Sequence, residues 1–162
     1  MPKNCVSRKA KIVLIVGGRG TGKTTYLEKL CPKNSTVVEL FITDRYTGGE
    51  YKRITYDNLK LSDCVNTTLI IEDATQICAA NSTRQVKQII VSSKQLGSDV
   101  FIVFHSVNFI PVFVLAMFDF MVLFDSEPAG KKPALQPYAD KINTILRRKH
   151  KQFKPCGVLE NL

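Results

Sequence analysis

The sequence predicts an α/β protein in which a doubly wound, mainly parallel sheet is flanked by helices. A short apolar run at 12–16 is followed at once by a glycine-rich loop and a helical segment. Further apolar runs of strand length recur along the chain and alternate with helical patterns, and the run at 100–104 is continuous enough for the centre of a parallel sheet. Strands that alternate with helices are joined by right-handed crossovers, which place the strands parallel.

Individual elements follow from the same patterns. Apolar, β-branched and aromatic residues predict five strands, at 12–16, 36–42, 67–71, 100–104 and 120–124. A helix is expected over 24–30, after the glycine-rich loop. Ser82 and Gln85 form a capping-box pattern that predicts a helix start, and Gly97 is a natural place for that helix to end.

Composition describes an ordinary globular chain of 162 residues with 44% apolar and 23% charged residues. We expect a polar leader at 1–10, a core at 11–128 and a basic carboxy-terminal segment at 129–162, packed on the core or extending from it. The five cysteines are scattered and show no metal-ligand spacing, which favours reduced thiols in the cytoplasm over a disulfide framework. No signal-peptide pattern indicates secretion.

Net charge is +9, and much of the excess lies near the carboxy terminus. Between 131 and 154 a single acid, Asp140, accompanies eight basic residues. These are Lys131, Lys132, Lys141, Arg147, Arg148, Lys149, Lys151 and Lys154. Such a segment could contact a polyanion such as nucleic acid, or it could be a solvated basic face, and charge alone does not decide between them.

The loop after the first strand reads G-x-x-x-x-G-K-T and is the phosphate-binding pattern in its expected place between strand and helix. Glycines let backbone amides surround a phosphate, and the helix amino terminus adds partial positive charge. Lys23 would reach the β- and γ-phosphates of ATP, and the Thr24 hydroxyl would bind Mg²⁺. The predicted nucleotide-binding residues are Gly17, Gly18, Arg19, Gly20, Thr21, Gly22, Lys23, Thr24 and Thr25.

Two further strands end in polar residues that could complete a catalytic site. Glu72 and Asp73 follow the third strand, and both are candidate Mg²⁺ residues together with Thr24. The first acid would bind the ion through water, and the second could orient and polarise the attacking water. An exposed turn or a helix cap is the structural alternative. His105 follows the fourth strand and could contact the γ-phosphate or the attacking water. Asn108 and Ser106 are second choices, so the catalytic candidates are Lys23, Glu72, Asp73 and His105.

The stretch at 100–118 contains no charged residue and is long enough to span a bilayer. Polar residues interrupt it at His105, Ser106 and Asn108, and Pro111 follows. A strand, a polar turn and a short buried helix explain this pattern better than a membrane span.

Taken in order, the phosphate loop, Leu-Ile-Ile-Glu-Asp, Lys-Gln-Leu-Gly, Val-Phe-Ile-Val-Phe-His and Phe-Ile-Pro resemble the FtsK–HerA superfamily of DNA-translocating ATPases. The resemblance covers roughly 10–125 and is strongest to the genome-packaging ATPases of tailless icosahedral viruses with double jelly-roll capsid proteins. It implies a RecA-like (ASCE-type) P-loop NTPase core, assembly into a ring that is commonly hexameric, and ATP-driven movement of double-stranded DNA without sequence preference.

The chain departs from that family at three positions. The family usually has Asp-Glu where this chain has Glu72-Asp73, so the catalytic carboxylate stays open between the two. Gln is typical at the position of His105, and Arg is common where this chain has Lys94, which lacks the planar fork. A ring ATPase also needs an arginine that reaches a neighbour's γ-phosphate. The candidates for this arginine finger are Arg84, Arg147 and Arg148.

Three other functions stay open besides a packaging motor. The first is a membrane-associated phage assembly ATPase of the zonula-occludens-toxin type, and the second a small P-loop kinase with Asp44-Arg45 in a lid. A nucleotide-dependent switch without turnover is the third. For the packaging motor we expect a location in the host cytoplasm or at a virion vertex, with a capsid-vertex or membrane protein as a further partner.

Overall fold

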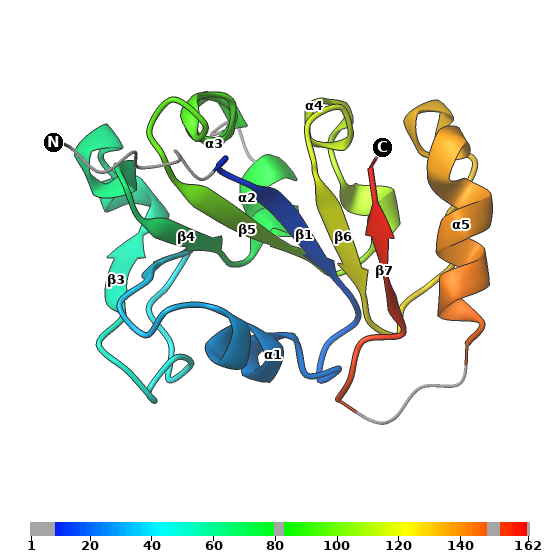
Figure 1. Ribbon diagram of the computed structural model, residues 1–162, viewed down its shortest axis with the longest axis horizontal. Coiled ribbons are helices and arrows are strands. Elements are labelled where there is room, and N and C mark those ends of the chain that lie inside the picture. Colours follow the sequence, from blue (N-terminus) through cyan, green and yellow to red (C-terminus); the bar gives the residue numbers. More distant parts are fainter. Residues whose placement is uncertain (1–8, 80–82, 149–152, 162) are drawn as a thin grey trace, which may run out of the picture.

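The computed structural model describes residues 9–79, 83–148 and 153–161 as a sheet with helices on both faces (Figure 1). Seven strands lie in the order β3-β2-β4-β5-β1-β6-β7. All neighbours pair in parallel except β6 and β7, which are antiparallel. The predicted fold class, a mainly parallel doubly wound sheet flanked by helices, is confirmed. The strands are β1 (Ile12–Val16), β2 (Thr36–Glu39), β3 (Lys52–Thr55), β4 (Thr68–Ile71), β5 (Asp99–Phe104), β6 (Phe120–Leu123) and β7 (Gly157–Glu160).

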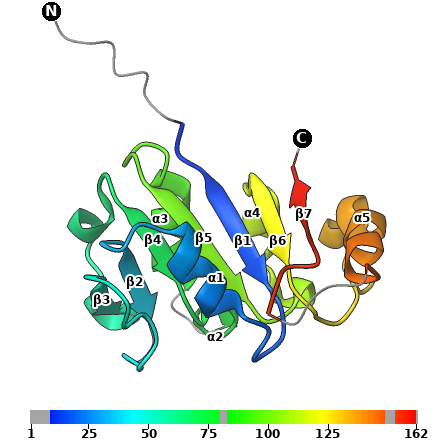
Figure 2. The ribbon, with the colours of Figure 1, turned by 60° about the horizontal axis from the view of Figure 1, so that its bottom comes forward.

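Helices connect these strands. The α-helices are α1 (Lys23–Leu30), α2 (Ala74–Ala79), α3 (Thr83–Ser92), α4 (Val112–Leu115) and α5 (Gln136–Leu146). Short 3-10 helices lie at Tyr56–Asn58, Leu61–Cys64, Val107–Phe109 and Pro133–Leu135. Figure 2 shows α1 on one face of the sheet and α2, α3 and α4 on the other.

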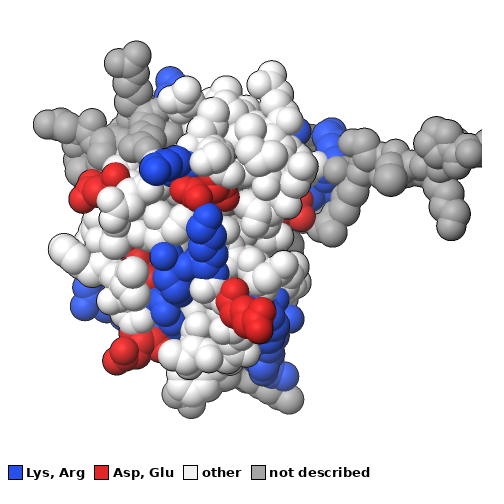
Figure 3. Space-filling view, turned by 90° about the vertical axis from the view of Figure 1, so that its left-hand side faces the viewer, with Lys and Arg blue, Asp and Glu red and all other residues white. Residues whose placement is uncertain are grey.

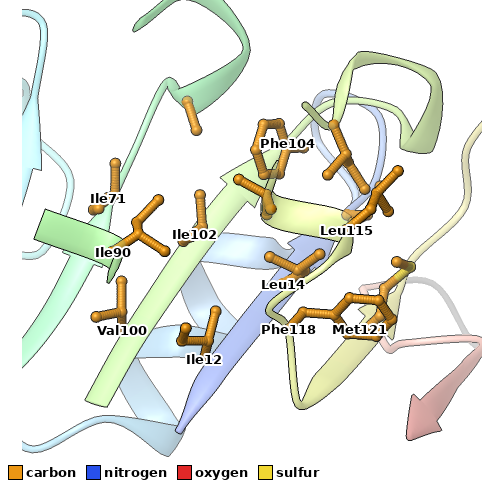
Figure 4. Close-up of a cluster of buried hydrophobic side chains, with 14 of the residues drawn as sticks. Ile12, Leu14, Ile71, Ile90, Val100, Ile102, Phe104, Leu115, Phe118 and Met121 are labelled. Atoms are coloured by element: carbon orange, nitrogen blue, oxygen red, sulfur yellow. The ribbon is translucent and has the colours of Figure 1, made fainter. Parts of the chain in front are cut away.

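Strand β1 lies at the centre of the sheet and is buried along its whole length. Its alternate side chains enter two separate cores: Ile12 and Leu14 pack on the α2–α4 face, and Val13 and Ile15 pack on the α1 face. Figure 4 shows the first of these cores, in which side chains of β1, β5 and β6 lie beside Ile90 of α3 and Leu115 of α4. Because both faces are covered, the strand reads as a continuous apolar run, which is why the sequence predicts it well.

The second predicted strand is shorter than expected. The 36–42 run was expected to be extended throughout, but β2 ends at Glu39. Phe41 and Ile42 lie beyond it with 78% and 58% of their surface exposed. Their β-propensity favours a strand, but no neighbouring strand continues there and no core covers them, so propensity alone overestimates its length.

The apolar stretch at 100–118 is folded as β5, a 3-10 turn and α4, as the polar interruptions predicted. Within the described ranges, no helix combines the length and the apolar character that crossing a membrane would require.

The helix predicted from the capping box begins directly after residues 80–82, which lie outside the described ranges. Ser82 lies outside the described residues, and α3 begins at Thr83. Its end is earlier than expected, at Ser92, and turns lead to Gly97, which has a φ of 69°. That left-handed conformation suits glycine and explains why the residue marks the stop.

The carboxy-terminal part adds a helix and an edge strand that the sequence did not predict. Helix α5 buries Ile142, and β7 buries Leu159 in the same core. The backbone N–H of Cys156 donates to the Leu123 carbonyl at 2.6 Å as β7 approaches β6. The cysteines that the structure describes, Cys31, Cys64, Cys78 and Cys156, are free thiols.

The central position of β1 leads to a stability prediction. Leu14→Ala should lower the free energy of unfolding by about 2–5 kcal/mol, because it removes a fully buried side chain from a packed core. Leu30→Ala is the matched control, since Leu30 is 50% exposed, and should cost less than about 1 kcal/mol. Urea unfolding measures both, and equal losses would contradict the assignment of Leu14 to the core.

Candidate functional site

The carboxyl ends of β1, β4 and β5 open into one cleft of about 470 Å³. That volume lies within the range of ligand sites. The cleft is lined by Arg19, Gly20, Thr21, Gly22, Lys23, Thr24, Thr25, Arg45, Glu72, Asp73, Gln76, His105 and Phe153. It therefore brings together the predicted phosphate loop, both predicted acids and His105. Crevices at the carboxyl ends of parallel strands are where α/β proteins bind ligands.

Backbone hydrogen bonds fix the start of the phosphate loop to the sheet. The N–H of Gly17 donates to the Phe104 carbonyl at 3.1 Å, and the N–H of Gly18 donates to the Asp125 carbonyl at 2.9 Å. A Cβ at Gly17 would lie 2.5 Å from the Cβ of Phe124, so a side chain cannot fit there. Gly17 and Gly18 hold the loop against β5 and β6 and do not line the cleft, although the sequence grouped them with the nucleotide-binding residues.

Lys23 is the first residue of α1 and is 8% exposed. Its Nζ donates to the carbonyls of Gly17 at 2.7 Å and Gly18 at 2.6 Å. Burial lowers the pKa of Lys23, and the nearby charge of Glu72 works in the opposite direction. The loop thus holds a partly desolvated ammonium that a polyanion could take from the two carbonyls.

Glu72 continues β4 beyond its last assigned residue, because its N–H donates to the Val38 carbonyl at 2.9 Å. It is 2% exposed, and its carboxylate accepts a hydrogen bond from the Tyr46 hydroxyl. Arg45 Nη1 lies 3.4 Å from the same carboxylate. Burial raises the pKa of Glu72, while Tyr46 and Arg45 favour its charged form. The exposed-turn alternative is therefore wrong for Glu72.

Asp73 differs from its neighbour in both exposure and backbone. Its side chain is 21% exposed and lies 3.4 Å from Arg45 Nη2. Its φ is 55°, an uncommon conformation that Asp tolerates better than most residues. Its carbonyl accepts from the N–H groups of Gln76 and Ile77, both at 3.0 Å, so it also starts α2. Asp73 thus both starts α2 and lines the cleft. Uncommon backbone conformations such as its positive φ are frequent at functional sites.

Arg45 and Tyr46 belong to the site, although the sequence pointed to Arg45 only as part of a lid in the kinase alternative and did not single out Tyr46. They come from the connection between β2 and β3, where Tyr46 has a φ of 59° and packs edge-on against Tyr51 with ring centroids 5.3 Å apart. Arg45 also lies 3.7 Å from Glu39 at the end of β2. Nothing in the local pattern connects this segment with Glu72, since their contact depends on β2 lying beside β4.

His105 follows β5 and lines the cleft as predicted. The backbone N–H of His105 donates to Thr75 Oγ1 at 3.2 Å, which ties the end of β5 to α2. Burial, with the charges of Lys23 and Arg19, lowers the pKa of His105, which favours the neutral form of its imidazole. Its Nδ1 is buried and has no hydrogen-bond partner among the described residues. An unsatisfied polar atom in a cleft is what a bound ligand or water would satisfy.

The two second-choice residues are engaged elsewhere. Ser106 Oγ donates to Glu127 Oε1 at 2.5 Å, and Asn108 Nδ2 lies 3.2 Å from the same oxygen. Neither lines the cleft. They tie the end of β5 to the segment after β6.

Two of the three predicted finger arginines, Arg147 and Arg148, do not line the cleft of their own chain. Arg147 and Arg148 follow α5, and Arg84 lies in α3, where its side chain is outside the described part of the structure. The roles assigned to these arginines therefore stay predictions.

Thr24, Glu72 and Asp73 all line the cleft, so the predicted Mg²⁺ ligands lie together. Their hydroxyl and carboxylate oxygens are the hard donors that Mg²⁺ prefers. Within the described residues, no group of three or more acidic, His or Cys side chains is arranged to hold a metal. Mg²⁺ is commonly held by one or two carboxylates together with substrate phosphates and water.

Neither protein-family models nor curated protein sequences yield a match to this chain. Solved structures do. The genome packaging NTPase B204 from Sulfolobus turreted icosahedral virus 2, in complex with ATP-gammaS, matches with a TM-score of 0.61 at 16% identity, over 90% of this chain and 89% of that one. The chain shares the fold of B204. The AMP complex of B204 matches with a TM-score of 0.56 at 14% identity, over 89% of each chain.

The likeness to B204 covers 90% of this chain. It agrees with the expected P-loop ATPase fold and with the predicted likeness to viral packaging ATPases. The narrower FtsK–HerA assignment stays a prediction.

The Tyr46 contact predicts how the pKa of Glu72 responds to mutation. Tyr46→Phe removes a hydrogen bond to the ionised carboxylate and should raise the Glu72 pKa further. A folded-state pKa above the unfolded value contributes stability that is lost as pH rises through it. The variant should therefore lose more free energy of unfolding than the wild type between about pH 5 and about pH 8.

Tyr51→Phe is the matched control, because the buried Tyr51 hydroxyl has no hydrogen-bond partner in the described structure. In urea unfolding at the two pH values, the free energy of unfolding of Tyr51→Phe should change with pH by as much as that of the wild type. If Tyr46→Phe matched this control, the Tyr46–Glu72 hydrogen bond would not influence the carboxylate.

Proposed function

We propose that this protein is an ATP-hydrolysing DNA translocase that acts as a ring in viral genome packaging. The observation that carries the proposal is one cleft that combines the phosphate loop with Glu72, Asp73 and His105, in a fold shared with a packaging NTPase. Fold likeness alone does not assign chemistry, so the site residues carry the argument.

ATP would place its phosphates against the amides of the loop. Lys23 Nζ would then exchange the carbonyls of Gly17 and Gly18 for phosphate oxygens. Its lowered pKa would return toward the usual value, because a polyanion stabilises the charged form. The buried ammonium would thereby gain charge-assisted hydrogen bonds to phosphate oxygens, which would favour binding of a triphosphate.

The two acids would divide the remaining work. When bound, Mg²⁺ supplies charge stabilisation at the β- and γ-phosphates, and Thr24 and Glu72 would hold it. Asp73 would orient and polarise the attacking water. The assignment follows from burial, because Glu72 is 2% exposed whereas the Asp73 side chain is 21% exposed and is more accessible to a water molecule; Arg45 contacts both acids.

His105 would report the state of the γ-phosphate as a positioning residue. Its neutral imidazole can hydrogen-bond to phosphate or water through the unsatisfied Nδ1. The backbone N–H of His105 is hydrogen-bonded to Thr75 in α2, so a movement of His105 would be transmitted directly to that helix. Such a link is what a motor needs to couple hydrolysis to movement.

DNA would be held through its phosphates without base reading, since a packaging motor must accept any sequence. The face at the β3 edge is a poor candidate, because it carries basic and acidic side chains intermixed (Figure 3), including the Lys52–Asp63 pair at 2.6 Å. The basic segment at 131–154 is the better candidate. In a ring, Arg84, Arg147 or Arg148 would reach the γ-phosphate of the neighbouring subunit.

Purified protein should hydrolyse ATP with Mg²⁺, and double-stranded DNA of any sequence should raise the rate. Added salt should reduce the stimulation, because phosphate contacts release counterions. Lys23→Ala should lower turnover at least about 100-fold through lost charge stabilisation. A steady-state phosphate-release assay measures all three effects. Hydrolysis that ignores DNA, or phosphate transferred to a small acceptor, would instead favour the kinase alternative, in which Arg45 would belong to a lid.

Asp73→Asn should separate binding from turnover. The amide keeps the shape but loses the proton-accepting charge, so turnover should fall by about 100-fold or more. ATP affinity, measured by calorimetry, should stay within about threefold of wild type, since the loop and Lys23 remain intact. Asp57→Asn, at an exposed acid that does not line the cleft, is the control and should retain full activity. Full turnover in Asp73→Asn would transfer the role to Glu72.

A further inference from the structure

Phe153 reaches the phosphate loop from the opposite end of the chain. A Cβ placed on Gly22 would lie 2.8 Å from the Phe153 Cα and 2.8 Å from its carbonyl oxygen. The two backbones are therefore in direct contact, and Gly22 is the residue that permits it. Phe153 is also the only phenyl side chain among the described residues that line the cleft.

The position of Phe153 is set by the sheet. Three residues later the N–H of Cys156 donates to the Leu123 carbonyl, and β7 then pairs with β6 from Gly157 onward. Phe153 has a φ of 63°, which is an outlier for a bulky residue. An uncommon backbone that directs an aromatic ring to a ligand cleft is the kind of local strain found at functional sites.

Burial does not explain Phe153, because 56% of its surface is exposed. A large apolar ring left half in water beside a polar loop loses hydrophobic stabilisation that a core position would provide. A flat ligand lying on the ring would recover it. The lining groups around the loop and the acids suit a triphosphate, but they offer no other apolar face for a base.

We propose that Phe153 is the nucleobase-stacking residue of this site. The inference rests on the proposed binding of a nucleoside triphosphate at the phosphate loop. With the phosphates against the amides before α1, the base lies on the Phe153 ring, at the side of Gly22 where the chain returns into β7. Aromatic side chains stack on nucleobases through their π-faces.

The chain contains no tryptophan, which makes a direct test available. Phe153→Trp introduces a single tryptophan at the proposed stacking position, and its emission can be excited separately from that of the tyrosines. ATP should quench its emission, and inorganic tripolyphosphate should leave it nearly unchanged, because only ATP carries a base. Phe109→Trp is the matched control, since Phe109 is also 56% exposed and does not line the cleft. Quenching by ATP equal to that in the control would overturn the proposal.

Affinity gives a second, independent test. Phe153→Ala should weaken ATP binding about tenfold, the lower part of the range for lost base stacking, and Phe153→Tyr should restore it. Tripolyphosphate should bind Phe153→Ala as it binds the wild type. Calorimetry with both ligands measures these effects, and unchanged thermal unfolding of each variant shows that the fold is intact.

Lys23→Ala distinguishes failure of this inference from failure of the proposed function. If Lys23→Ala weakens binding of ATP and tripolyphosphate while Phe153→Ala changes neither, Phe153 does not stack on the base although the phosphate loop binds. If Phe153→Ala weakens the binding of ATP and of tripolyphosphate equally, the substitution acts on the phosphate loop, and the stacking role is wrong. If Lys23→Ala binds ATP as the wild type does, the loop is not the binding site and both proposals are wrong.

Discussion

Two buried charges of opposite sign, on Lys23 and Glu72, impose the main constraint on this structure. A buried charge is costly unless polar groups or an opposite charge compensate it. The loop carbonyls of Gly17 and Gly18 compensate the ammonium, and Tyr46 and Arg45 compensate the carboxylate. The glycine-rich loop and the connection after β2 therefore have the same task at this cleft: each supplies polar groups that compensate a buried charge. A site balanced in this way can exchange an internal partner for a ligand without leaving a charge unpaired.

The same electrostatics explains the conformation of the connection between β2 and β3. Glu39 is fully buried at the end of β2, and Arg53 on β3 pairs with it at 2.7 Å. Arg45 lies between Glu39 and the acids after β4, so it is shared among three carboxylates on neighbouring strand ends. This cluster holds the backbone of the connection over the cleft, whereas Phe41 and Ile42, which have no such partners, remain exposed.

Sequence alone predicts the parts of the site whose chemistry is local. The phosphate loop is recognisable because its glycines, Lys23 and Thr24 are consecutive and lie between a strand and a helix. Glu72 and His105 are recognisable as polar residues at the ends of apolar runs. Arg45 reaches the site only because β2 pairs with β4, and Phe153 only because β7 returns beside β6. Such placements depend on strand order, which local propensity does not encode. The short, half-exposed β7 gave no strand signal for the same reason.

Strand register is what makes these separate contributions work as one site. Val38 pairs with Ile71, and the Glu72 N–H extends the ladder by one hydrogen bond to the Val38 carbonyl. Side chains alternate between the faces of a sheet, so a slip of one residue would turn Glu72 away from Lys23 and toward the opposite core. The apolar residues of β4 would move to the wrong faces in the same step. The register that buries Leu69 and Ile71 in the core is thus also the one that places the carboxylate in the cleft. Selection for a packed core and selection for the site therefore act on the same pairing of β2 with β4.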